Sequence, residues 1–106
     1  MSKKKALKLV GQLEKLQEEM LKAQERLGEE TIEVTAGGGA VKVVIDGHQR
    51  LRSITISPEV VNPEDVELLQ DLILIAVNEA IERAQALAAE KLSSIVGGIE
   101  VPGLNF

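Results

Sequence analysis

The sequence predicts an α+β fold of the order α-β-β-β-α, in which a three-stranded antiparallel meander is flanked by two long helices. Residues 32–57 contain three short runs of alternating apolar residues, separated by turns at residues 37–39 and 46–48 that both contain glycine. On each side of this block the apolar residues recur at helical spacing. A chain of 106 residues also has the size expected of one domain.

An N-terminal helix is predicted over residues 1–28. Its apolar residues are spaced alternately three and four apart, which is the pattern of a coiled-coil seam. They are Ala6, Leu9, Leu13, Leu16, Met20, Ala23 and Leu27. Gly28 follows the last of them, where a glycine commonly ends a helix. Such a helix is roughly 36 Å long against about 20 Å for the strands, so its N-terminal part is expected to project as an arm.

The sheet is predicted over residues 31–57 as two hairpins in series. Glycine suits both turns because it reaches positive φ without a Cβ clash. Alternation gives the strands one shared apolar face. This face contains Ile32, Val34, Ala36, Val41, Val43, Ile45, Ile54 and Ile56. Leu51 and Ile54 are out of phase, which predicts a bulge near Arg52.

A second helix is predicted over residues 63–93. Asn62 and Pro63 are typical of a helix start, and Gly97 of a helix end. Residues 97–106 are expected to form a flexible tail. The middle of this helix is apolar nearly all round, so it needs cover on more than one side. Because a single chain cannot easily cover this helix, the heptad seam and two open sheet edges, we expect a symmetric homodimer.

Signals for catalysis or cofactor binding are weak. Cysteine is absent and His48 is the only histidine, beside a turn glycine, where we interpret it as structural or solvated and not catalytic. The glycine run 37–39 lacks the following helix and Lys-Ser/Thr of a phosphate-binding loop. We therefore expect no enzyme, cofactor, metal site or small-molecule substrate. No apolar run approaches the roughly 18 residues of a membrane span, and the lysine-rich start lacks the apolar core of a secretion signal, so no membrane association is expected.

Positive charge gathers at the N-terminus although the net charge is −5. Residues 1–28 contain seven basic and four acidic side chains, whereas the rest contains five basic and thirteen acidic ones. Two interpretations stay open for this start: a solvated terminus, or a phosphate-binding site helped by the helix dipole. Aromatic residues make up 1% of the chain, which disfavours base stacking on single strands and favours contact with the backbone of duplex DNA.

Arg83 and Lys91 could extend such a site along the second helix. The alternative is that they pair with neighbouring carboxylates of Glu79, Glu82 or Glu90.

Several motifs resemble the YbaB/EbfC family of nucleoid-associated proteins. They are the glycine-rich hairpin 35–43 (TAGGGAVKV), the turn 46–48 (DGH), the strand end 54–58 (ITISP), and the helical stretches 67–73 (ELLQDLI) and 76–80 (AVNEA). The resemblance implies a bacterial cytoplasmic protein of the nucleoid, a homodimer that associates through its sheet region, and DNA binding by the helical arms. We assign dimerisation to Val41, Val43, Ile45, Ile54 and Ile56. We assign DNA contact to Lys3, Lys4, Lys5, Lys8, Lys15, Arg83 and Lys91.

Two functions follow from these observations. The first is binding of double-stranded DNA by a homodimer, mainly through phosphates and with little sequence preference. If four to six phosphates are neutralised per dimer, log K should fall with log salt at a slope of roughly −4 to −5. The alternative is a non-enzymatic protein-interaction module that uses the helical arms.

Overall fold

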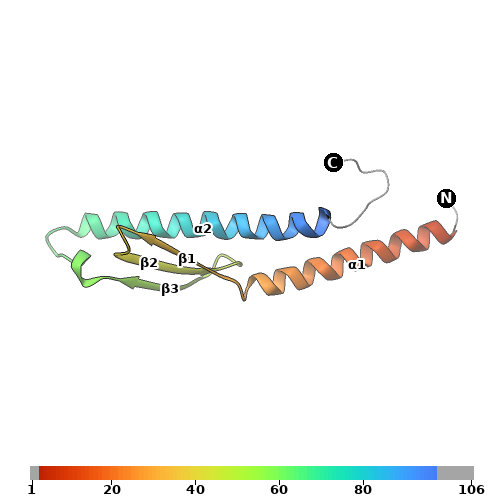
Figure 1. The fold of residues 1–106 in the computed structure, drawn as a ribbon, viewed down its shortest axis with the longest axis horizontal. Coiled ribbons are helices and arrows are strands. Elements are labelled where there is room, and N and C mark those ends of the chain that lie inside the picture. Colours follow the sequence, from red (N-terminus) through yellow and green to blue (C-terminus); the bar gives the residue numbers. More distant parts are fainter. Residues whose placement is uncertain (1–2, 98–106) are drawn as a thin grey trace.

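The computed structural model of the chain describes residues 3–97. Its elements are α1 (Lys3–Leu27), β1 (Thr31–Ala36), β2 (Val41–Asp46), β3 (Leu51–Ile56), the short 3-10 helix η1 (Pro58–Val60) and α2 (Val66–Gly97). Their order confirms the predicted α-β-β-β-α fold (Figure 1). Of the tail predicted over residues 97–106, Gly97 is the last residue of α2 and the remainder lies outside the described residues.

The three strands form one antiparallel sheet in the order β1-β2-β3. All three glycines of the first turn have positive φ, between 64° and 93°, which explains why the sequence has a glycine run there. In the second hairpin Val44 pairs with Ser53 and Ile45 pairs with Leu51, so Arg52 is left without a partner. This is the predicted bulge.

One helix covers one face of the sheet. α2 packs mainly on β1 and β2, and the core between them contains Val34, Ala36, Val41, Val43 and Ile45 from the strands and Ala76, Ala80 and Ala84 from the helix. The three alanines are four residues apart and fully buried. Because these side chains are small, the helix can lie close to the sheet.

The edge strand β3 is covered less well. Ile54 pairs with the buried Val43 and therefore belongs to the same face, as predicted, but 44% of it is exposed. Leu51 is 43% exposed. The reason is that α2 lies over the other two strands, so the apolar face continues beyond the helix at this edge.

α2 begins at Val66, after the start at residue 63 that the sequence suggested, and ends at Gly97. Asn62 and Asp65 form a turn before it, in which the backbone N–H of Asp65 donates to the Asn62 carbonyl at 2.9 Å. The Asp65 carboxylate then accepts a hydrogen bond from the backbone N–H of Leu68 at 3.3 Å, in the manner of an N-cap.

α1 leaves the sheet and projects as an arm. Its C-terminal end lies beside α2, and the helix then continues past the end of α2 (Figure 1). The molecule is consequently elongated, with extents of 75 × 24 × 16 Å. Leu27 is the one buried residue of α1. The rest of its apolar seam is half-buried or exposed.

Candidate nucleic-acid interface

The basic residues of α1 gather on one side of the helix. At 3.6 residues per turn, five of them fall within about 40° of one another around the helix axis. We call these five, Lys4, Lys8, Lys15, Lys22 and Arg26, the basic stripe. All are exposed. The stripe extends over 23 residues, which is roughly 33 Å along the helix. Its lysines face away from the apolar seam, whereas Arg26 also lies near the seam residues Ala23 and Leu27.

The N-terminal part of the stripe is not neutralised by carboxylates. The first turn of α1 contains no acidic residue. Within residues 3–97, Lys4, Lys8 and Lys15 take part in no ion pair, whereas Lys22 pairs with Glu18 at 3.1 Å. Three ammonium groups on one helix face are therefore available to an external anion.

The other residues that we assigned to DNA contact lie outside the basic stripe. Lys3 and Lys5 are exposed on α1 and lie to either side of the stripe by helical phase. Arg83 pairs with Glu79 at 2.8 Å, which is one of the alternatives that the sequence left open.

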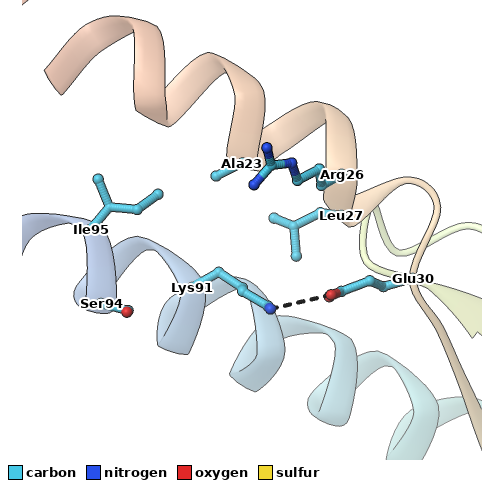
Figure 2. A pocket seen from close by; sticks show the side chains of 7 residues that line it. All are labelled: Ala23, Arg26, Leu27, Glu30, Lys91, Ser94 and Ile95. Atoms are coloured by element: carbon cyan, nitrogen blue, oxygen red, sulfur yellow. Dashed lines mark ion pairs between the residues drawn. The ribbon is translucent and has the colours of Figure 1, made fainter. Parts of the chain in front are cut away.

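Lys91 pairs with Glu30 at 3.2 Å, a carboxylate distant in sequence (Figure 2). This ion pair borders a small cavity of about 150 Å³ between α1 and α2. The cavity is lined by Ala23, Arg26, Leu27, Glu30, Lys91, Ser94 and Ile95. Lys91 thus ties α2 to the segment that follows α1.

The predicted dimerisation residues separate into two groups. Val41, Val43 and Ile45 are 0% exposed and fill the core of their own subunit. Ile54 and Ile56 lie on the edge strand β3, where Ile54 is exposed and Ile56 is half-buried. Only the second group is presented at the surface of the chain.

The β2–β3 turn contains a buried carboxylate. Asp46 is 1% exposed and accepts hydrogen bonds from the backbone N–H groups of Arg50 and His48, at 3.0 and 2.8 Å, and from Arg52 Nε at 2.8 Å. The Arg50 N–H, followed by the Arg52 side chain and the His48 N–H, holds the pKa of Asp46 below its usual value, although burial opposes this shift. The carboxylate is therefore an ionised, fully bonded centre of the turn.

The chain is similar to known proteins over nearly its whole length. Residues 3–99 match the model of the YbaB/EbfC DNA-binding family. The chain belongs to this family. It is 50% identical over 97 residues to a nucleoid-associated protein of Pelotomaculum thermopropionicum, with 92% of each chain covered. It is 53% identical over 97 residues to a nucleoid-associated protein of Acetivibrio thermocellus, with 91% of this chain and 86% of the relative covered. The YbaB/EbfC resemblance predicted from the sequence motifs is thus confirmed.

The fold has also been seen in a solved structure. The chain superposes on an uncharacterized protein from Helicobacter pylori with a TM-score of 0.75 and 22% identity, covering 84% of this chain and 94% of the other. This likeness supports the fold of the YbaB/EbfC member described here. Between residues 3 and 97, no helix is both long and apolar enough to cross a membrane.

Two residues of the basic stripe were not among the predicted DNA contacts. Lys22 lies seven residues after Lys15, and Arg26 four residues after Lys22. Both spacings return to the same helix face, so the signal was present in the sequence. The prediction relied on the density of lysines at the start of the chain, which does not distinguish one face of the helix from another.

Proposed function

We propose that this protein binds duplex DNA as a nucleoid-associated homodimer, and that the basic stripe of α1 contacts the phosphates. Membership of a DNA-binding family and the names of the relatives support DNA as the partner. The observation that supports the stripe is the group of three exposed lysines on one helix face, Lys4, Lys8 and Lys15, without carboxylate partners among residues 3–97.

The length and placement of the stripe suit a duplex. Its roughly 33 Å is close to one turn of B-DNA, about 34–36 Å, so one arm can reach several phosphates. The acidic body repels DNA at long range, which leaves the projecting arm as the favoured point of approach. Phosphate contacts fix orientation and do not read sequence, so weak sequence preference is expected. Arg83 and Lys91 are each held by a carboxylate, and we expect them to contribute less.

The dimer is proposed to form through apolar surface that a single chain leaves open. This surface includes Ile54 and Leu51 on β3, and Leu74 and Ile75 on α2, which are between 43% and 59% exposed. The unpaired edge of β3 also offers backbone groups to another strand. Because the proposed partner is chromosomal DNA, we expect the protein in the cytoplasm, at the nucleoid.

The test is duplex DNA binding by a variant with Lys4, Lys8 and Lys15 replaced by glutamine. A matched control replaces Lys42, Arg50 and Arg83 by glutamine, which removes the same charge from the body. Fluorescence anisotropy with a labelled duplex should show a large loss of affinity for the first variant and a small one for the second. Size-exclusion chromatography should show that both variants keep the oligomeric state of the wild type.

A protein-interaction module is the second candidate. The observation in its favour is an apolar groove on the arm, lined by Leu13, Leu16, Gln17, Met20, Leu21 and Gln24. If the lysine variant bound DNA as tightly as the wild type, the proposed role of the stripe would be wrong and this alternative would be favoured.

A further inference from the structure

The end of α1 is held by the β2–β3 turn through backbone carbonyls. The last carbonyls of a helix have no partner within the helix. Here the carbonyl of Gln24 is bonded to His48 Nε2, that of Leu27 accepts from the backbone N–H of Gly47 at 2.8 Å, and that of Gly28 accepts from Arg52 Nη2 at 3.1 Å. Two donors of the β2–β3 turn and one of β3 thus bind three carbonyls at the base of the arm.

Asp46 organises these donors. One carboxylate oxygen accepts from the backbone N–H of His48, and the other accepts from Nε of Arg52. Arg52 is the bulge residue of β3, and a bulge redirects the side chain of the extra residue. Its guanidinium therefore bridges the buried carboxylate and the carbonyl of Gly28.

The contact leaves no room for larger residues. A Cβ at Gly47 would collide with the Leu27 carbonyl, and a Cβ at Gly28 would lie 2.7 Å from Cε1 of His48. Gly47 is therefore required by the close approach of the helix end to the turn, whereas a side chain at position 28 would displace the His48 ring. These residues account for the Asp-Gly-His motif of the sequence, to which the DNA-binding proposal assigns no role.

We propose that Asp46, Gly47, His48 and Arg52 form a carbonyl clamp that fixes the direction of the arm and so positions the basic stripe. The inference rests on the proposed function of the stripe. α1 is buried only at Leu27 and contacts α2 only towards its C-terminal end, so the direction of the arm is set at its base, where the clamp lies. A tilt of about 10° there would move the tip of a roughly 36 Å helix by about 6 Å, nearly twice the axial spacing of phosphates on one DNA strand, about 3.4 Å.

The clamp is tested by comparing His48→Ala and Arg52→Ala with Arg50→Ala. The last variant removes a charge from the same turn but leaves the clamp intact, because Arg50 donates to Asp46 only through its backbone. The chain has no cysteine, so Glu14→Cys and Glu59→Cys can bear the only spin labels. Electron double resonance on labelled protein diluted with unlabelled protein reports the distance between arm and body in one subunit.

The distance distribution should be narrow in wild type and Arg50→Ala, and broader or shifted in His48→Ala and Arg52→Ala. In His48→Ala and Arg52→Ala, the slope of log K for duplex binding against log salt should become shallower by about 1 to 2. Unchanged distributions would overturn the clamp, whether or not the protein binds DNA. Broadened distributions with unchanged DNA binding would overturn its positioning role. His48→Ala keeps every hydrogen bond of the Asp46 carboxylate, so the test remains available if Arg52→Ala fails to fold.

Discussion

Replacement of Ala80 by leucine tests the packing of α2 on the sheet, which forms the hydrophobic core of the subunit. Ala80 is 0% exposed and lies between two equally buried alanines on the same helix ridge. A leucine adds three carbon atoms where the helix approaches β1 and β2. Added methylenes in a packed core typically destabilise by about 1–3 kcal/mol. For a domain of this size each kcal/mol lowers Tm by about 4 °C or more.

The assay is thermal denaturation followed by circular dichroism, with the same protein concentration for every variant because an oligomer's Tm depends on concentration. Ala89→Leu is the matched control, since Ala89 is on the same helix but exposed, and both residue types favour helices. Ala80→Leu should lower Tm by several degrees relative to Ala89→Leu. Equal Tm values would refute close packing of the alanine ridge on the sheet.

Three further predictions concern single positions. Gly37→Ala should lower Tm more than Gly38→Ala, because both have positive φ but only the Cβ at position 37 would press on Leu72, at 2.9 Å. The Asp46 carboxylate, with its lowered pKa, stabilises the fold fully above about pH 4 and loses this effect as pH falls through the folded-state value. Urea midpoints of the wild type and Asp46→Asn should therefore differ by a constant amount from neutral pH to about pH 4, and converge as pH is lowered further. Gly11 lies in an exposed part of α1 with open space around it, so Gly11→Ala should raise the stability of this helix by about 0.5–1 kcal/mol. Circular dichroism should show that the variant retains more helix than the wild type at the same elevated temperature.

Local patterns in the sequence predicted most of the fold. Strand alternation identified the core residues Val41, Val43 and Ile45, and the phase change between Leu51 and Ile54 located the bulge. These features depend on neighbouring residues, so they can be read from one chain. The exposure of Ile54 could not be predicted in the same way, because it depends on which strands a distant helix covers.

The candidate interface was predicted only in part. The density of lysines pointed to the arm, but the basic stripe depends on helical phase and includes Lys22 and Arg26. The pairing of Lys91 with Glu30 joins residues far apart in sequence. The partner of the turn histidine was likewise unpredictable, because His48 is bonded to a carbonyl of α1 that the tertiary fold brings near.

The salt dependence of duplex binding tests the central claim most directly. Neutralisation of four to six phosphates by two arms predicts a slope of log K against log salt of roughly −4 to −5 for the wild type. The variant lacking Lys4, Lys8 and Lys15 should show a much shallower slope, because only Lys22 and Arg26 of the stripe remain on each arm. A slope that is flat in the wild type, or equally steep in the variant, would contradict phosphate binding by the stripe.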